Sequence, residues 1–346
     1  RDYYASRGLG DVYKRQLFSI LWVAILFAAI MGAVATGVIN SYYSGILVLI
    51  GINIILAVSL NLVTGFLGQL VLGHAGFMSV GAYSAALFTM HAGLPISVAF
   101  PLGLIFGGLV AAIFGVIIGV PALRLRGDYL AIITLGFGEI IRVLVLAVDF
   151  TGGAAGLTGI PYIEGKYTLI IYTFFIAFLT VVAILAFIRS RHGRAVIAIR
   201  EDEIAAEASG INTTYYKLLA FVVAAFFAGV AGGIYAHYIG VLDPSKFDFN
   251  YSVEILIMVV LGGMGSITGS VCSATVLTLL PEMLRSFADK RMLIYSLVLI
   301  IVMLFKPTGL LGTREFSVRK IVGKLFKEKK KDTGTPPVGG APGKEA

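Results

Sequence analysis

The sequence predicts an all-α protein, a polytopic transmembrane bundle of about ten helical elements. Hydrophobic residues make up 58% of the 346 residues and charged residues only 13%, and the mean hydropathy is +0.94. A soluble core of this length could not bury so much apolar surface. Several apolar runs approach the ~20 residues that a helix needs to cross a bilayer, whereas a transmembrane barrel would show alternating segments of ~10 residues.

The expected elements follow in order from the N-terminus. Residues 1–16 are polar and rich in aromatic residues, unlike the apolar run after them, and we interpret them as a foreign leader or a fragment boundary. Six crossings are then expected before Arg189, and the third of them is shorter and broken by glycines. In chain order they are Leu17–Val38, Ser44–Leu60, Gly68–His91, Ile96–Val120, Tyr129–Val148 and Leu169–Ile188.

Four more elements are expected between Tyr215 and Phe305, which would complete a membrane domain over residues 17–305. Here the apolar run Val253–Leu261 is short, and the stretch "LGGMGSITGS" interrupts what could otherwise be one long helix. Broken helices occur in membrane proteins where the backbone is buried in protein or lines a cavity. We therefore expect a half-length or re-entrant segment in this part of the chain.

The distribution of charge predicts the orientation. Residues 306–346 hold ten Lys and Arg against four Asp and Glu, and the positive-inside rule places such a tail in the cytoplasm. The loops Arg124–Asp128 and Arg189–Arg194 are expected on the same side, and the loop Thr151–Lys166, which has almost no basic residue, outside. Both termini are thus expected in the cytoplasm, and the Gly- and Pro-rich end of the basic tail is expected to be largely disordered.

Motifs for several chemistries are missing. The sequence has no G-x-x-x-x-G-K-[ST] loop, so the chain is not expected to bind ATP through a P-loop of its own. Its four histidines are far apart along the chain, and Cys and His do not cluster, so neither a metal nor another cofactor is expected. A nucleic-acid partner is not expected either.

Two polar groups within one predicted span stand out. Glu139 and Arg142 lie three residues apart on one face of the span Tyr129–Val148, about half-way along it. Charged groups inside a membrane usually pair and face the bundle interior or a water-filled path. They could be a mutually neutralised pair that fixes helix packing, or a gate or lining of a polar pathway, and the sequence leaves both open.

A second polar region precedes and opens the glycine-broken crossing. Glycines allow helix backbones to approach closely or a helix to unwind, so that neighbouring amides and an imidazole could face a pathway. A histidine here could equally be a hydrogen-bonding residue between helices. The candidate pathway or gating residues in this region are Asn61, Gln69, Gly73, His74 and Gly76.

A charged segment, residues 189–214, interrupts the apolar runs. After Arg200 its Glu residues suit the first turns of a short helix, and Gly210 stands where that helix would end. This helix would carry a small apolar face that fits a groove in another protein, although a solvated linker is the alternative. The residues of the face are Ile204, Ala208 and Ile211.

Taken together, five blocks of the chain resemble the M-type permease subunits of branched-chain amino acid ABC importers. The resemblance runs from about Ile50 to Gly312, and five blocks at compatible spacings make it specific. The blocks are "GQLVLGHAGFMSVGAYSAAL", "RLRGDYLAIITLGFGEIIR", "GGAAGLTGIP", "GRAVIAIREDEIAAEASGIN" and "LGGMGSITGS", in that order.

The resemblance implies that residues 189–214 are the cytoplasmic coupling segment, which docks on an ATPase subunit and passes its closure to the membrane helices. ABC importer permeases generally carry E-A-A, three residues and Gly here. Ala205, Ala206 and Gly210 match, but Ile204 occupies the Glu position, with Glu203 one residue earlier. The implied docking residues are Gly193, Arg194, Arg200, Glu203, Ala205, Ala206, Glu207, Ala208 and Gly210.

The resemblance also implies partners and a solute. The chain would pair with an H-type paralogue in the cytoplasmic (inner) membrane of a bacterium, together with two ATPase subunits that bind ATP and Mg²⁺ and an extracytoplasmic binding protein. It would form half of a pathway for leucine, isoleucine and valine and would not itself be an enzyme. A permease for urea or short amides is the first alternative. The second is an ion-coupled secondary transporter, with Glu139 or Glu254 as the ion site.

Overall fold

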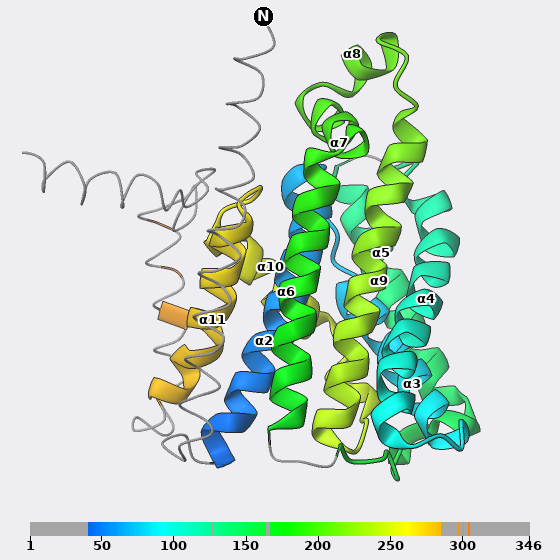
Figure 1. Ribbon diagram of the computed structural model, residues 1–346. Helices are drawn as coiled ribbons and strands as arrows, with labels where there is room; N and C mark the ends of the chain where they lie inside the picture. Colours follow the sequence, from blue (N-terminus) through cyan, green and yellow to red (C-terminus); the bar gives the residue numbers. More distant parts are fainter. Residues whose placement is uncertain are drawn as a thin grey trace, which may run out of the picture. The chain divides into compact units, whose positions relative to one another are not determined.

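The computed structural model describes residues 41–125, 127–163 and 167–284, together with the single residues Ser296, Leu297, Ile300 and Leu304. Throughout this part of the chain the regular elements are helices, so the predicted all-α fold is confirmed there (Figure 1). The leader 1–16, the crossing Leu17–Val38, most of the last expected element and the tail 306–346 lie outside the described residues.

Five helical segments in the described residues are long and apolar enough to cross a membrane. Each matches an expected crossing or the first of the four later elements, and the observed helices extend a few residues beyond most of the predicted spans. The five segments are Tyr42–Phe66, Ile96–Ala122, Asp128–Ala147, Thr168–Arg189 and Thr213–Ile239.

The first interrupted pair of helices is α2 and α3. Helix α2 (Ser41–Asn61) continues into η1 (Leu62–Phe66), a turn of π-helix, and the chain then turns at Gly68, whose φ is +77°. Non-helical residues lead to α3 (His74–His91), so the expected crossing Gly68–His91 is helical only from His74. π-turns are rare and are frequent at functional sites.

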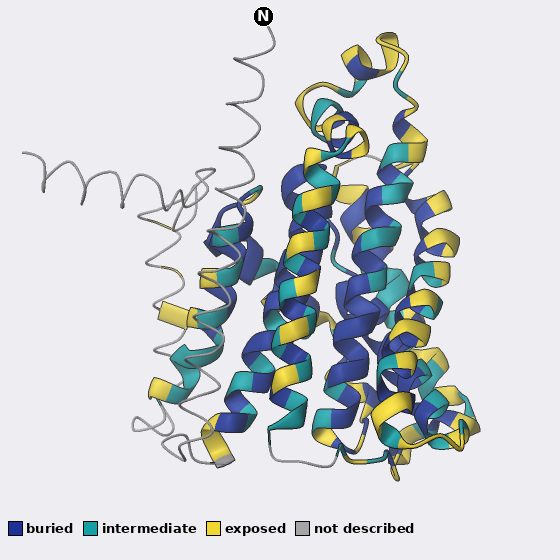
Figure 2. Ribbon diagram, viewed as in Figure 1, coloured by how far each residue is buried: buried dark blue, intermediate teal, exposed yellow. Residues whose placement is uncertain are grey.

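Three longer helices follow. Helix α4 (Ile96–Ala122) starts after Pro95, and α5 (Asp128–Ala147) starts after Gly127. The loop after α5 contains the short 3₁₀ helices η2 (Asp149–Thr151) and η3 (Gly153–Ala155) and leads to α6 (Thr168–Arg189). Burial differs between the central and peripheral helices (Figure 2). In the apolar 18-residue stretch of α2 and η1, 83% is buried, but in that of α5 only 22% is buried.

Small residues bring α3 and α4 against α9 (Thr213–Ile239). A side chain at Gly81 of α3 would overlap the backbone of Gly229 in α9, and a side chain at Gly232 would overlap the carbonyl of Met78. Between transmembrane helices such close approach increases the dispersion contacts that hold a bundle together. The glycines of this region therefore pack the core.

The second interrupted pair is α10 (Phe249–Gly262) and α11 (Ile267–Met283), which follow η4 (Pro244–Lys246). The break expected in "LGGMGSITGS" is confirmed: α10 ends at Gly262, and Ser266 caps α11 by accepting a bond from the Gly269 N–H. Helix α10 starts four residues before the apolar run Val253–Leu261, because the Asp248 carboxylate caps it through the Tyr251 N–H.

Between α6 and α9, two short helices lie beyond one end of the bundle (Figure 1). Helix α7 (Arg191–Glu201) and helix α8 (Glu203–Ala208) replace the single short helix that the sequence predicts after Arg200. They are separated at Asp202, whose backbone is extended and whose carboxylate accepts bonds from the N–H groups of Ile204 and Ala205.

Candidate functional site

The two interrupted pairs of helices meet at the N-termini of α3 and α10. The backbone N–H of Ala75 in the first turn of α3 donates a 3.1 Å hydrogen bond to the Ser252 hydroxyl in the first turn of α10. Both groups are buried. This bond satisfies one of the N–H groups that the start of a helix leaves without an intrahelical partner, and it joins two segments far apart in the sequence.

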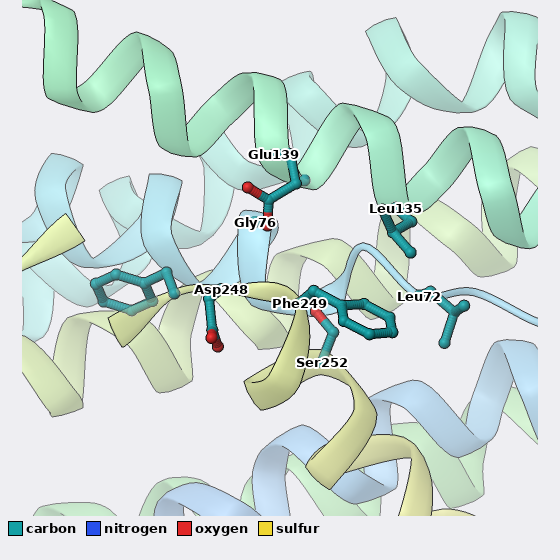
Figure 3. Close-up of a pocket in the computed structure, with 9 residues that line it drawn as sticks. Leu72, Gly76, Leu135, Glu139, Asp248, Phe249 and Ser252 are labelled. Atoms are coloured by element: carbon teal, nitrogen blue, oxygen red, sulfur yellow. The ribbon is translucent and has the colours of Figure 1, made fainter. Parts of the chain in front are cut away.

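A small cavity with mixed lining lies at this junction (Figure 3). Glu139 of α5 and Asp248 and Ser252 of α10 supply its polar groups, and apolar side chains and two glycines complete the wall. The lining residues are Leu72, Gly76, Leu135, Gly138, Glu139, Phe247, Asp248, Phe249 and Ser252. The cavity has room for about one water molecule, so a larger solute would need the helices around it to move apart.

Glu139 and Arg142 form the pair that their spacing predicts. Arg142 Nε donates to Glu139 Oε2 at 2.7 Å, and the two side chains are 30% and 32% exposed. Glu139 lines the cavity, whereas Arg142 does not. The arrangement is thus both an intrahelical ion pair and, through its carboxylate, part of a cavity wall.

Gly73 and Gly76 lie where α3 approaches α5. A side chain at Gly73 would overlap the Thr134 carbonyl, and a Cβ at Gly76 would come within 2.9 Å of the Gly138 Cα. The Thr134 hydroxyl also accepts a bond from the Leu72 N–H at 3.1 Å. Of the two glycines only Gly76 borders the cavity, and both hold the start of α3 against α5.

The three polar candidates before and at the start of α3 do not line this cavity. His74 Nε2 lies 2.9 Å from the Ser59 hydroxyl, a contact between α3 and α2. The buried Asn61 carboxamide binds backbone groups between α10 and α11. The Gln69 Oε1 atom is buried and has no hydrogen-bond partner among the described residues.

The loop before α10 is paired to the loop after α5. Leu157 and Leu242 exchange backbone hydrogen bonds of 2.9 and 3.0 Å, which places the chain just ahead of α10. Next to this pair, Asp243 caps η4. Hydrogen bonds from the Ser245 hydroxyl and N–H, with the nearby Lys246 ammonium, lower the pKa of the Asp243 carboxyl.

The inner side of the segment 189–214 is tied to the bundle. Gly193 is buried against the end of α6, where a side chain would overlap the carbonyls of Phe187 and Ile188. The Glu203 carboxylate pairs with Lys217 Nζ of α9 at 2.8 Å, and the Lys217 side chain is only 3% exposed. Arg200 Nη1 donates to the Gly65 carbonyl of η1 at 2.7 Å.

The outer side of the same segment is open. Ile204 is 72% exposed, whereas Ala206 is buried against the bundle. Gly210 has a φ of +84°, so it ends the turn after α8 in the left-handed conformation that glycine favours. The other predicted docking residues on this outer side are Arg194, Ala205, Glu207 and Ala208, all exposed.

Sequence reasoning missed the residues that the fold brings in from a distance. Asp248 and Ser252 were not among the candidates, although "DFN" before an apolar run is a helix-start signal that could have marked Asp248. Lys217 was also missed, and its only signal is a lone cation in the first turns of an apolar helix.

Five apolar helices of membrane-spanning length together with two interrupted helix pairs are typical of integral membrane proteins of the transporter class. The model of a family described as "Branched-chain amino acid transport system / permease component" matches residues 42–306. The chain belongs to this family of permeases.

Individual proteins that are similar to this chain are branched-chain amino acid permeases as well. The branched-chain amino acid permease protein LivM of Salmonella typhimurium is 37% identical over 337 residues, which cover 87% of this chain and 76% of LivM. LivM of Escherichia coli is 37% identical over 333 residues with the same coverage. LivH of Escherichia coli is 35% identical over 143 residues, 40% of this chain and 46% of LivH. The family therefore includes both paralogous types of permease.

Among solved structures, the chain is similar to PsaBC from Streptococcus pneumoniae in complex with Fab. The TM-score is 0.44 and the sequence identity 15%, over 80% of this chain and 95% of that chain.

Proposed function

We propose that the chain is the M-type permease half of a bacterial ABC importer that carries leucine, isoleucine and valine across the cytoplasmic membrane. Its membership of the permease family and its 37% identity to LivM over most of both chains support this solute class. In this proposal the polar and apolar groups around the small cavity between α3, α5 and α10 line the pathway when these helices move apart, because the cavity itself has room for about one water molecule.

The proposal includes partners that this chain requires. An H-type paralogue forms the other half of the pathway, as the shared family of LivM and LivH supports. Two ATPase subunits bind ATP and Mg²⁺ on the cytoplasmic side, and an extracytoplasmic binding protein delivers the solute. The chain itself binds no cofactor.

The two-sided character of α7 and α8 carries the proposal. Their inner side is fixed to η1 and α9 through Arg200 and Glu203, and their outer side presents Ile204 with the small Ala205 and Ala208. In this proposal a shallow groove of another protein covers Ile204 and the small alanines beside it, and the inward bonds support it, because a single exposed apolar residue needs no partner by itself. A solvated linker would not need the bonds that Arg200 and Glu203 make to η1 and α9.

The docking experiment uses the tagged chain expressed with its permease partner and the ATPase. Ala208→Arg places a long cation on the outer side and is expected to release the ATPase on detergent purification and to abolish leucine uptake. Ala155→Arg, at an exposed alanine of η3 after the far end of α5, is the matched control and should retain the ATPase. Normal retention of the ATPase by Ala208→Arg would refute docking at α8.

The solute and the energy source are tested separately. Leucine, isoleucine and valine should compete for uptake by reconstituted vesicles, and urea should not. Uptake should stop when ATP is removed. Uptake that persists without ATP and follows a pH gradient would favour an ion-coupled transporter.

A further inference from the structure

Arg200 lies at the end of α7 and is exposed, but its guanidinium is directed to η1. Its Nη1 atom donates a 2.7 Å bond to the carbonyl of Gly65 in η1. Gly65 belongs to the last turn before the chain leaves its helix at Gly68, and such a turn leaves carbonyls without intrahelical partners. A cation is also favoured there by the helix dipole.

Glycines make the space that the Arg200 side chain fills. A Cβ at Gly68 would come within 2.9 Å of the Arg200 Cγ, so the aliphatic stem runs directly over this turn. A Cβ at Gly265, in the loop between α10 and α11, would come within 3.0 Å of Arg200 Nη1. The guanidinium is therefore seated between the end of η1 and the break of the second helix pair.

Asn61 joins these two places directly. Its Oδ1 atom accepts a 2.9 Å bond from the Gly265 N–H, and its Nδ2 atom donates a 3.0 Å bond to the Ser266 carbonyl. Asn61 is fully buried, so both bonds are shielded from water. The Arg200–Gly65 bond and the two Asn61 bonds lie side by side, because Gly65 is packed against Asn61 and Gly265 lies beside Arg200 Nη1, and we call these five residues, Arg200, Gly65, Asn61, Gly265 and Ser266, the arginine junction.

The arginine junction connects α7 with both helix pairs that border the cavity. From η1 the chain runs through Leu72 to Gly76 on one wall, and from Gly265 the preceding helix α10 runs back to Ser252 on the opposite wall. The Ala75–Ser252 hydrogen bond joins the two helix pairs at the cavity. Among the described residues, Arg200 is the side chain of α7 that donates a hydrogen bond to η1.

We propose that Arg200 is a positioning residue that passes the movement of α7 to both interrupted helix pairs, and so couples ATP hydrolysis to the separation of these helices around the small cavity. The inference rests on the proposed function, because α7 moves only if an ATPase docks on the outer side of α7 and α8. A π-turn beside a glycine bend is a suitable place for the movement, since few bonds must change there. Arg200 then acts inside the permease and does not contact the ATPase.

The test compares two substitutions at one position. Arg200→Met keeps an unbranched stem over Gly68 but removes the donor, and Arg200→Lys keeps a cationic donor that can reach the Gly65 carbonyl. Arg191→Met changes an exposed arginine at the start of the same helix and is the matched control. Each variant is purified with its permease partner and ATPase and reconstituted in liposomes with the binding protein, and leucine uptake and ATP hydrolysis are measured on the same vesicles.

Arg200→Met should lower the leucine imported per ATP hydrolysed by at least about tenfold, the size expected for a lost hydrogen bond to a charged donor. The ATPase should remain bound, Arg200→Lys should recover part of the ratio, and Arg191→Met should keep it. An unchanged ratio in Arg200→Met, or an equal loss in Arg191→Met, overturns the inference. If Arg200→Met does not assemble, the leucine imported per ATP hydrolysed is compared between Arg200→Lys and the unchanged chain instead.

The two proposals fail in different ways. If Arg200→Met keeps its ratio while Ala208→Arg releases the ATPase, the arginine junction is not the coupling route but docking stands. If Ala208→Arg retains the ATPase and imports leucine, docking itself is wrong and the inference falls with it.

Discussion

The ion pair between Glu203 and Lys217 should hold α8 to α9, and removing either charge should have unequal effects. Lys217 Nζ and Glu203 Oε1 are 2.8 Å apart, with side chains that are 3% and 26% exposed. Glu203→Gln leaves a buried ammonium facing a neutral amide. Lys217→Met instead removes the buried charge and keeps the length of the side chain.

The magnitude follows from the burial of the two partners. Removing one member of a fully buried pair costs about 3–5 kcal/mol, whereas an exposed pair contributes about 0.2–1 kcal/mol. Because water reaches Glu203, we expect Glu203→Gln to weaken the attachment of α8 by about 1–3 kcal/mol, or about 5- to 150-fold in its opening equilibrium. Lys217→Met should cost less, because no unpaired charge stays buried.

Hydrogen exchange of the α8 amides measures this opening. Glu203→Gln should speed exchange by the factor above, Lys217→Met by a smaller factor, and the double variant should resemble Lys217→Met. Glu207→Gln, at an exposed position on the same helix, is the control and should leave exchange unchanged. Equal effects of the two single changes, or strictly additive ones, would refute the reasoning that a buried charge dominates.

Two further predictions concern the cavity. Gly76→Ala puts a methyl group 2.9 Å from the Gly138 Cα, so α3 and α5 must separate. The free energy of unfolding should fall by about 1–3 kcal/mol and uptake should fall with it. Gly136→Ala, which has open space around it on α5, should change neither. Glu139→Gln breaks the pair with Arg142 and should reduce leucine uptake while leaving it ATP-dependent, and an unchanged uptake rate would show that the carboxylate has no part in the pathway.

Two features that depend only on residues close together in the sequence were predicted correctly. The ion pair of Glu139 and Arg142 is fixed by helical spacing, and the break between α10 and α11 by "LGGMGSITGS". Helix α10 was predicted too short because Asp248 and the aromatic Phe249 lie outside the purely apolar run. A hydropathy pattern detects the apolar run but not the capping side chain at which the helix begins.

Contacts between distant segments were beyond the sequence. Glycines 65 and 68 suggested a broken helix, but nothing local shows that an arginine 132 or more residues later fills the space beside them. Asn61 was expected to face a pathway because the glycines near it could let the helix unwind. Its partners are the Gly265 N–H and the Ser266 carbonyl, which belong to a loop that only the tertiary fold brings near.

This chain departs from the general coupling motif at Ile204, which occupies the Glu position, and the structure gives this departure a physical reason. Glu203, one residue before the motif's Glu position, is directed to Lys217 and holds α8 to its own bundle, so it does not replace an outward carboxylate. The residue that stands at the motif position, Ile204, is the one directed outward, with 72% of its surface exposed. If an ATPase docks here as proposed, Ile204 would give it an apolar contact, and the partner surface should be apolar as well, because a buried unpaired charge opposite Ile204 would weaken docking.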